Sequence, residues 1–377
     1  MKIAFDLRRI KNPGIGRYMK CLVEAVVPQA TEHEYLLIMP PDGHDELEVM
    51  GPAIEKVASS LKYYSIHEQL ALPGFLRRNR VDLLHSPHFN VPLLSPCPTV
   101  VTIHDVIYLA CKEDLGSFVG RSYYRAMMAA SVRLAKRIIT DSDYSRRDIV
   151  ELLNGDPDKI DVIYPGVDEH FQKVSDRGII TSTIAKYGIS APYILYTGIY
   201  KPRKNHAGLV RAFQLFGQQG QNAELVIAGP TAEGEQELKR LASELGVAAK
   251  VKFTGFVDDA DLPALYSGAR LYACASLYEG FGFTILEAMA CGVPVVSSQA
   301  TSLPEVAGDA ALLADASNPE EFSQALVAAF SQDGLRADLI EKGFRNCQRF
   351  QWQEAARQTR AVYAKALRTS APRAVPA

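Results

Sequence analysis

One stretch constrains the fold of this chain more than any other, because residues 269–297 predict a strand, a glycine loop, a helix and a second strand in direct succession. The runs Ala269–Ala275 and Pro294–Ser297 are short and apolar, which is typical of buried strands. Gly280 and Gly282 permit the tight loop that leads into the helix. A strand that follows another through a helix runs parallel to it, so this stretch predicts an α/β domain.

The same loop predicts a site for an anionic sugar compound. The helix is expected to begin near Phe283 and to end at Gly292 and Pro294, and the free N–H groups of its first turn favour an anion. Glu279 and Glu287 flank that turn and could accept hydrogen bonds from sugar or ribose hydroxyls. Either glutamate alone is as well explained by a solvated loop or by ordinary helix formation. The glycine pattern between them favours a sugar nucleotide.

The composition restricts the class of protein. A chain of 377 residues is long enough for two domains with separate cores. The net charge of −2 gives no indication of nucleic-acid binding. Because no apolar run is long enough to span a bilayer and the N-terminus lacks the apolar core of a signal peptide, we expect a cytoplasmic protein. The six cysteines are scattered without a C-x-x-C pair, so we expect reduced, buried thiols.

The first half alternates between strand and helix patterns. Strands are predicted at 2–6, 35–39, 81–85, 99–104, 137–140 and 160–164, and helices at 121–135 and 144–153. This alternation predicts a parallel, doubly wound sheet, in which ligands bind beyond the carboxyl ends of the strands. Three segments fall at those ends: Gly14–Gly16, His85–His88 and His104–Asp105.

The glycines and two of the histidines leave alternatives open. Gly14 and Gly16 would let the backbone approach a ligand, but a dinucleotide fingerprint needs a third small residue where this chain has Met19. A plain tight turn explains the two glycines as well. His85 and His88 have no third ligand of matching character nearby in the sequence, so we expect no zinc site.

His104 is a stronger candidate for a functional histidine. It follows an apolar run and is expected at the mouth of the sheet, where a neutral imidazole could hydrogen-bond a sugar hydroxyl. Asp105 is expected to orient the ring. The alternative is a structural histidine that caps the end of a strand.

The second half predicts another Rossmann-like sheet, with strands at 193–198, 224–230, 251–256, 270–275, 294–297 and 310–313. Residues 166–190 are expected to be an irregular linker. We therefore expect an N-terminal domain over 1–175, a C-terminal domain over 190–350, and a tail over 351–377. The tail carries a helix from Gln353 to Leu367 that we expect to pack back on the first domain.

A basic loop follows the first strand of the second sheet. After Gly198 come Lys201, Arg203 and Lys204, at the same edge of the sheet as the helix that begins near Phe283. A solvated loop would be basic about as often. Because the loop and the helix share one edge, we favour binding of a diphosphate.

Two further charge patterns can be explained without a ligand. Asp141-Ser142-Asp143 and Asp259-Ala260-Asp261 could hold a divalent cation, but both precede helices, so helix capping is the preferred interpretation. Basic residues cluster between 121 and 147, at Arg121, Arg125, Arg133, Lys136, Arg137, Arg146 and Arg147. They fit either a solvated surface or a peripheral contact with anionic lipid.

Together these features resemble the family 4 retaining glycosyltransferases, over almost the whole chain. The most specific element is the E-x₇-E pattern Glu279–Glu287; the segments Pro202–Asn205, Leu303–Glu305, His104–Asp105 and Ile163–Val167 are also similar to members that build bacterial surface polysaccharides. The resemblance implies the GT-B fold, in which two Rossmann-like doubly wound domains face each other across a cleft. It implies an acceptor-binding N-terminal domain and a C-terminal domain that binds the nucleotide sugar.

The resemblance also implies roles for individual residues. The expected catalytic residues are Glu279, Arg203, Lys204 and His104. The donor is expected to contact Glu287, Gly198, Gly280, Phe281, Gly282, Phe283, Thr284 and Phe256. The residues expected near the acceptor or phosphates are Gly14, Gly16 and Asp105. Many members carry an arginine directly after the glycine of the strand-end loop, where this chain has Ile199. Arg203 is expected to take over that role, and its division of labour with Lys204 stays open.

The implied reaction is the metal-independent transfer, with retention, of mannose or 6-deoxymannose (rhamnose) from a GDP-sugar to a hydroxyl of a lipid-linked, O-antigen-type glycan. The GDP-sugar is a co-substrate, and no cofactor or nucleic-acid partner is expected. UDP-linked donors stay open.

The main alternative is a GT-B enzyme that is not a transferase, such as a sugar-nucleotide epimerase or hydrolase. An NAD-dependent dehydrogenase is disfavoured by the incomplete fingerprint, and a non-catalytic sugar-binding protein would show no donor turnover. The protein is expected in the cytoplasm, with a peripheral contact at the inner face of the membrane as one interpretation.

Overall fold

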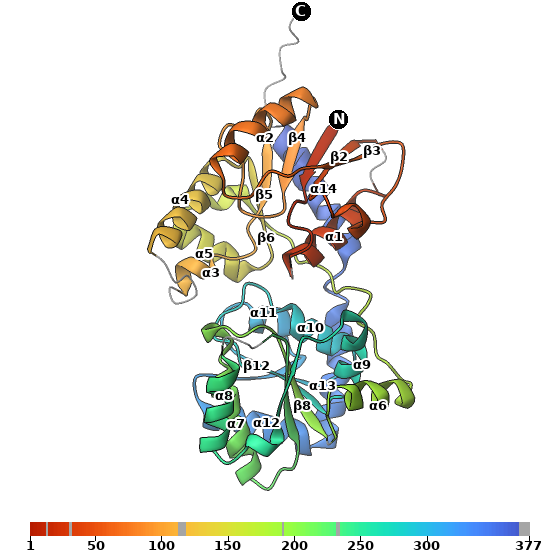
Figure 1. Cartoon of the computed structure of the whole chain (residues 1–377), viewed down its shortest axis with the longest axis vertical. Coiled ribbons are helices and arrows are strands. Elements are labelled where there is room, and N and C mark those ends of the chain that lie inside the picture. The colour runs from red at the N-terminus through yellow and green to blue at the C-terminus, as the bar shows by residue number, and fades with distance from the viewer. Residues whose placement is uncertain (13, 30–31, 112–117, 191, 231–233, 369–377) are drawn as a thin grey trace, which may run out of the picture. The chain divides into compact units, whose positions relative to one another are not determined.

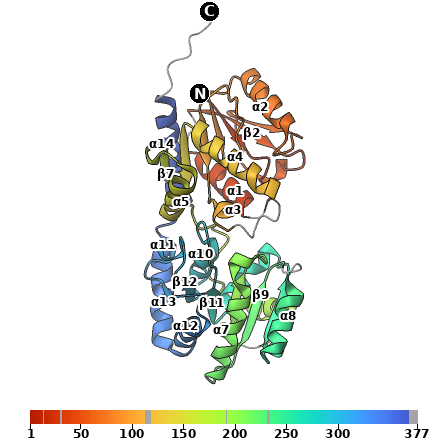
Figure 2. The same ribbon diagram turned by 90° about the vertical axis from the view of Figure 1, so that its left-hand side faces the viewer.

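A computed structural model describes residues 1–12, 14–29, 32–111, 118–190, 192–230 and 234–368. The chain divides into two compact units, each built on its own sheet (Figures 1 and 2). Unit 1 comprises Met1–Gly166 and Phe350–Ala377, and unit 2 comprises Val167–Arg349. Within the described residues, no helix is both long and apolar enough to cross a bilayer.

Unit 1 has a parallel sheet of seven strands in the order β3-β2-β1-β4-β5-β6-β7. Its strands are β1 Lys2–Asp6, β2 Glu34–Met39, β3 Ile54–Ala58, β4 Leu83–Ser86, β5 Thr99–Thr102, β6 Arg137–Thr140 and β7 Ile160–Val162. Its helices are α1 Ile15–Val26, α2 Ile66–Arg78, α3 Ile107–Ala110, α4 Phe118–Leu134, α5 Asp143–Leu153 and α14 Trp352–Arg368. The strand order reverses between β1 and β4, which is where ligands of such sheets bind.

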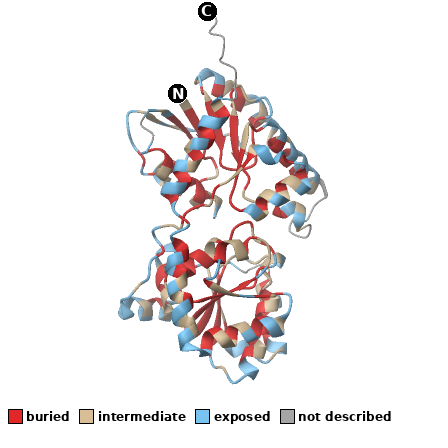
Figure 3. Cartoon of the chain, turned by 180° about the vertical axis from the view of Figure 1, so that it is seen from behind, coloured by how far each residue is buried: buried red, intermediate tan, exposed pale blue. Residues whose placement is uncertain are grey.

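Unit 2 has a parallel sheet of six strands in the order β10-β9-β8-β11-β12-β13. Its strands are β8 Tyr193–Thr197, β9 Glu224–Ala228, β10 Val251–Gly255, β11 Leu271–Cys274, β12 Val295–Ser298 and β13 Ala311–Ala314. Its helices are α6 Arg177–Lys186, α7 His206–Gln218, α8 Glu235–Glu244, α9 Leu262–Gly268, α10 Phe283–Ala290, α11 Leu303–Ala307, α12 Pro319–Ser331 and α13 Asp333–Cys347. Most of the strand residues are buried (Figure 3), which agrees with their near-continuous apolar runs. The predicted α/β class with two doubly wound sheets is confirmed.

Three elements differ from the sequence-based expectation. The segment expected to be irregular contains α6, whose first turn is capped by the side chain of Asp176. Strand β3 and helix α2 were not predicted. Helix α2 contains Pro73, which usually breaks a helix, and β3 is a half-exposed edge strand with charged residues between its apolar ones.

Helix α14, the last in the sequence, completes unit 1 by packing against α1 (Figure 1). Its Tyr363 hydroxyl lies 2.7 Å from Nδ1 of His85, and the Trp352 ring packs edge-on against Tyr18. A side chain at Gly166 would meet the backbone nitrogen of Trp352 at 2.4 Å. The chain thus leaves unit 1 at Gly166 and returns to it near Trp352, and these two residues are in contact.

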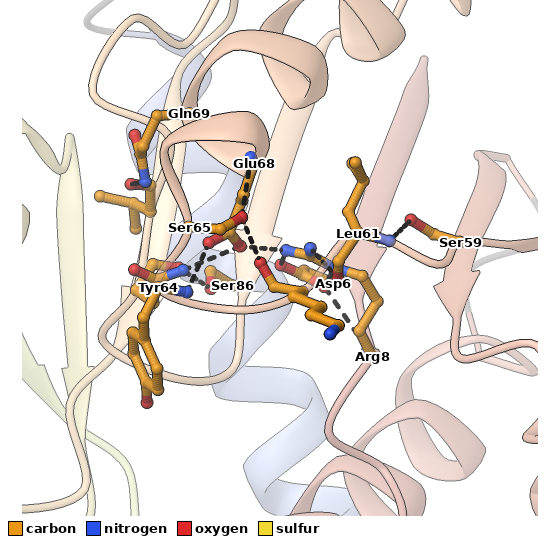
Figure 4. A network of polar contacts seen from close by, with 12 residues as sticks. Asp6, Arg8, Ser59, Leu61, Tyr64, Ser65, Glu68, Gln69 and Ser86 are labelled. Carbon is orange, nitrogen blue, oxygen red and sulfur yellow. Dashed lines mark hydrogen bonds and ion pairs between the residues drawn. The ribbon is translucent and has the colours of Figure 1, made fainter.

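A buried network of charges fixes the loop between β3 and α2 (Figure 4). The Arg8 guanidinium donates hydrogen bonds to Asp6 and Glu68 at 2.6 Å each, and the three side chains are almost completely buried. Arg8 also donates to the carbonyl of Leu61, and the Glu68 carboxylate accepts from the backbone N–H of Tyr64. Because each buried charge has a partner, the network specifies one position for this loop.

Replacing Arg8 by Met should destabilise unit 1 by roughly 3–5 kcal/mol, because two buried carboxylates would lose their cation. Urea denaturation measures the loss. The matched control is Lys2→Met, which breaks the more exposed ion pair with Glu55 and should cost about 0–1 kcal/mol. Equal midpoints for the two variants would show that the network does not hold unit 1 together.

Candidate active site

Two loops at the carboxyl edge of the second sheet meet through an ion pair. The loop after β8 forms a short 3-10 turn at Pro202–Lys204, and Glu279 lies in the loop after β11. The Lys204 ammonium donates a hydrogen bond of 2.5 Å to the Glu279 carboxylate, and the two side chains are only 14% and 12% exposed. Strands β8 and β11 are neighbours in the sheet, so their loops leave side by side.

The backbone holds this arrangement in place. The N–H of Leu277 donates to the carbonyl of Arg203 at 2.7 Å, which joins the two loops a second time. On the other side, the N–H of Glu279 donates to the hydroxyl of Thr301, and the Ser302 hydroxyl donates to the Glu279 carbonyl. The carboxylate is therefore positioned by its own backbone as well as by Lys204.

Glu279 is an anion in this setting. Burial by itself would raise the pKa of its carboxyl, but the charge and hydrogen bond of Lys204, with help from Arg203, hold the pKa below its ordinary value of 4.5. A lysine ammonium has three N–H donors, of which Glu279 takes one. Lys204 can therefore bind a second, anionic partner without leaving Glu279.

The glycine loop leads directly into helix α10, as predicted. Gly282 adopts φ 113°, a conformation that few other residues take, and the helix begins at Phe283. No side-chain hydrogen bond caps this end, so the first-turn amides are available to donate to an anion. The helix ends at Ala290, before Gly292 with φ 74°, as expected.

The other predicted donor contacts lie at the same edge. Phe256 follows β10 directly and is 72% exposed, which suits a ring that stacks on a base. Glu287 is 9% exposed, and its carboxylate accepts a hydrogen bond of 2.8 Å from the hydroxyl of Tyr266. That hydroxyl lies 2.7 Å from the side chain of Thr197 at the end of β8. Gly198 packs under the ring of Tyr196, since a side chain there would meet the Tyr196 hydroxyl at 2.9 Å.

In unit 1 the structure changes the partner that was expected for His104. Asp141, at the carboxyl end of β6, lies 2.7 Å from Nδ1 of His104, while Asp105 accepts instead from the N–H of Ile107. The expectation that Asp105 orients the ring is wrong, because the end of the neighbouring strand reaches the imidazole and the adjacent side chain does not. The ring of Tyr18 packs edge-on against His104 at 4.5 Å.

Asp141 raises the pKa of the His104 imidazole. Burial would lower the pKa of the imidazole, but the charge and hydrogen bond of Asp141 raise it above the ordinary value of 6.5. Asp141 therefore favours the protonated form of the His104 ring, whereas a neutral imidazole was expected from the sequence. The other ring nitrogen of His104, Nε2, lies 3.2 Å from the carbonyl oxygen of Pro87 and donates its N–H there.

The remaining candidates in unit 1 are largely structural. Gly14 adopts φ 75° at the start of α1 with open space beside it, whereas a side chain at Gly16 would meet the carbonyl oxygen of Ile10 at 1.9 Å. Gly16 is thus required by packing within its own loop. His85 is fully buried between Tyr363 and Thr102, and burial lowers its pKa to about 3.

The Asp-x-Asp triplets also find protein partners. In the first, Ser142 caps α5, as predicted, and Asp141 binds His104. In the second, Asp261 makes no side-chain capping bond at the start of α9, so capping by this residue is wrong; it binds Lys186, as does Asp258 just before the triplet. Their charges are thus used in ion pairs of the fold.

Replacing Asp141 by Asn should lower the pKa of His104, since the carboxylate charge that raises it would be lost. NMR titration of the imidazole Cε1 proton measures the change. Because folding raises this pKa, the pair stabilises the fold fully below pH 6.5 and loses its contribution as the pH rises through the raised value. An unchanged His104 titration would refute the assignment of Asp141.

The chain is similar in sequence to known glycosyltransferases. The sequence model described as "Glycosyl transferases group 1" matches residues 182–346, and "Glycosyltransferase Family 4" matches residues 14–171. The chain is 31% identical to the O-antigen chain mannosyltransferase B of Escherichia coli, across 96% of this chain and 99% of that protein. It is 30% identical to the serotype-specific mannosyltransferase WbdA of Escherichia coli, across 72% of this chain but only 34% of that protein.

Solved structures share the fold. The sucrose-phosphate synthase of Thermosynechococcus elongatus superposes with a TM-score of 0.78 at 19% identity, covering 98% of this chain and 100% of that one. HepE of Anabaena, in complex with UDP and glucose, superposes with a TM-score of 0.77 at 21% identity, covering 97% and 99%. The predicted GT-B fold is thereby confirmed, and with the mannosyltransferase similarity over nearly its full length, the chain belongs to glycosyltransferase family 4.

Proposed function

We propose that this glycosyltransferase moves mannose or 6-deoxymannose from a GDP-sugar to a hydroxyl of a lipid-linked, O-antigen-type glycan, with retention and without a metal ion. The observation that carries the proposal is the buried Lys204–Glu279 pair beside the first turn of α10. The similarity to an O-antigen mannosyltransferase over 96% of the chain supports the choice of sugar.

The phosphate side of the site favours departure of a nucleoside diphosphate. Breaking the bond between sugar and phosphate leaves negative charge on the β-phosphate. Lys204 and Arg203 carry positive charge at the carboxyl edge, and the amides of Phe283 and Thr284 open the nearby helix. Groups held in position before the reaction stabilise this charge without a cost of reorganisation. Lys204 is oriented by Glu279 and so meets this requirement.

Retention follows in this proposal from attack on the face that the leaving group vacates. The sugar becomes oxocarbenium-like, and the departing phosphate oxygen takes the proton of the acceptor hydroxyl. A covalent intermediate on Glu279 is the less favoured route, because a carboxylate stabilised by Lys204 is a weaker nucleophile. Glu279 instead accepts hydrogen bonds from the hydroxyls of the donor sugar.

The remaining residues take supporting roles in the proposal. Glu287 would bind the ribose, with Tyr266 fixing its carboxylate, and the exposed ring of Phe256 would lie against the base. His104, held at Nδ1 by Asp141, would exchange the hydrogen bond between Nε2 and the Pro87 carbonyl for one to a sugar hydroxyl. An epimerase or hydrolase is not favoured, since the relatives that cover most of the chain transfer sugars by name.

Contact with an anionic membrane is proposed for the basic cluster between 121 and 147. Arg125 and Arg133 are exposed on α4, whereas Arg137 is taken up by an ion pair with Asp161. The lipid-binding part of the cluster is therefore the surface of α4. A polybasic surface of this kind gains about 1 kcal/mol per cation at an anionic bilayer.

Incubation with a panel of GDP- and UDP-sugars and a lipid-like saccharide acceptor should give a product only with a GDP-hexose. Mass spectrometry identifies the sugar, and NMR of the anomeric proton should show the configuration of the donor. Added EDTA should leave the rate unchanged. An inverted product, or free sugar and GDP without any transfer, would contradict the proposal.

Replacing Glu279 by Gln or Lys204 by Met should reduce kcat/KM on the order of 10²–10³-fold while the protein stays folded. The matched control is Lys239→Met, which breaks a surface ion pair with Glu235 and should keep near-normal activity. Since the pKa of Glu279 lies below 4.5, wild-type activity should not decline between pH 7 and about 5 through this group. Near-normal turnover in either site variant would refute the assignment.

Sedimentation with vesicles that contain anionic lipid should pull down the wild type but not the double variant Arg125→Glu/Arg133→Glu, which carries the opposite charge on α4. Neutral vesicles and 0.5 M salt serve as controls, since about 0.5 M salt screens such attraction strongly. Equal sedimentation of both proteins with anionic vesicles would rule out this surface.

A further inference from the structure

A second group of side chains lies at the carboxyl edge of the first sheet. Two tyrosines stand partly exposed there, Tyr64 before α2 and Tyr123 on α4, at 40% and 41%. Their ring centroids are 6.1 Å apart and their planes are nearly perpendicular, at 85°. Phe89, in the loop after β4, covers one face of Tyr64 in a stacked contact at 5.8 Å. The pair forms an aromatic corner.

The backbone of Tyr64 is held in a strained conformation. Its φ of 62° is unusual for a bulky residue. The Glu68 carboxylate accepts the Tyr64 N–H at 2.9 Å, and Glu68 itself is anchored by Arg8 and by the Asn90 amide. Figure 4 shows the Tyr64 ring pointing away from this network. Buried charges thus hold an exposed ring in a costly position, a pattern that is concentrated at ligand sites.

The phenol of Tyr64 is fixed as well. It contacts the guanidinium of Arg9 and lies 2.7 Å from Nε2 of His88, which is 3.2 Å from the same guanidinium. Because arginine only donates, Nε2 of His88 is the acceptor, and the Tyr64 hydroxyl accepts from Arg9 and donates to His88. Burial, together with the charge of Arg9, keeps His88 neutral by lowering its pKa. Arg9 retains further N–H donors beside the ring.

This chemistry matches a sugar ring better than a lipid chain or a peptide. A pyranose presents polarised C–H groups on its faces and hydroxyls at its rim. The C–H groups favour the negative face of an aromatic ring, and the hydroxyls favour fixed donors such as those of Arg9. Single exposed tyrosines need no explanation, but a rigid corner of two, with a cation oriented alongside, does.

We propose that Tyr64 and Tyr123 form a stacking site for a pyranose unit of the acceptor glycan, with Arg9 binding its hydroxyls. The inference rests on the proposed transfer to a glycan and adds the residues that hold the acceptor. It differs from the expectation that the acceptor lies near Gly14, Gly16 and Asp105. It also gives the buried network of Arg8 and Glu68 a purpose beyond stability.

The test measures both acceptor kinetics and direct binding. Replacing Tyr123 by Ala on the surface of α4 should raise the KM for the acceptor roughly tenfold and weaken binding of an α-linked mannotriose, followed by saturation-transfer NMR, by a similar factor. Tyr123→Phe keeps the ring and should change either value less than about twofold. Tyr64→Ala should match or exceed the Tyr123→Ala effect. The affinity for GDP should be unchanged in all variants, because the site lies in unit 1.

The control is Tyr144→Ala on helix α5 of the same unit, which should keep both values. If Tyr123→Ala folds and binds mannotriose as the wild type does, the stacking site is wrong, even where transfer proceeds normally. If the wild type transfers no sugar to any glycan, the proposed function is wrong, and the mannotriose titration still decides the site: binding that is lost in Tyr123→Ala supports it, and absence of binding in the wild type overturns it.

Discussion

The ion pair between Lys204 and Glu279 is the interaction on which the candidate active site depends. It joins the loops of two neighbouring strands, β8 and β11, at the edge where parallel strands place ligands. Both groups are mostly buried, so neither tolerates the loss of the other. Gly282 turns the chain into α10 three residues later, so the ion pair and the start of the helix belong to one loop. A charged group, a carboxylate and free amides are thus assembled before any substrate arrives.

In unit 1, ion pairs also position the loops at the carboxyl edge of the sheet. The Arg8 guanidinium lies between Asp6 and Glu68, and the network positions the loop that carries Tyr64. His104 is likewise oriented by Asp141. In each case a buried ion pair links the ends of different strands or loops, and an exposed or partly exposed group takes its position from it. Such pairs add little net stability, but they specify one arrangement of loops that would otherwise have several.

Most of the fold could be predicted from the sequence, because buried parallel strands are short apolar runs and Gly282 and Gly292 bound the helix between them. Side-chain contacts between residues that are distant in the sequence could not be predicted. Asp141 lies 37 positions from His104, and only the pairing of β5 with β6 brings them together. The loop that carries Tyr64 has one detectable signal: Ser65 and Glu68 form the spacing of a capping box, and Ser65 does accept the Glu68 N–H.

The most direct measurement of the central claim is a crystal structure of the full chain with bound GDP-mannose. We expect the diphosphate within hydrogen-bond distance of the Lys204 ammonium and of the amides of Phe283 and Thr284, with the Glu279 carboxylate bound to hydroxyls of the mannose. A diphosphate bound instead at the loop of Gly14 in unit 1, with the Lys204–Glu279 pair free of ligand, would contradict it.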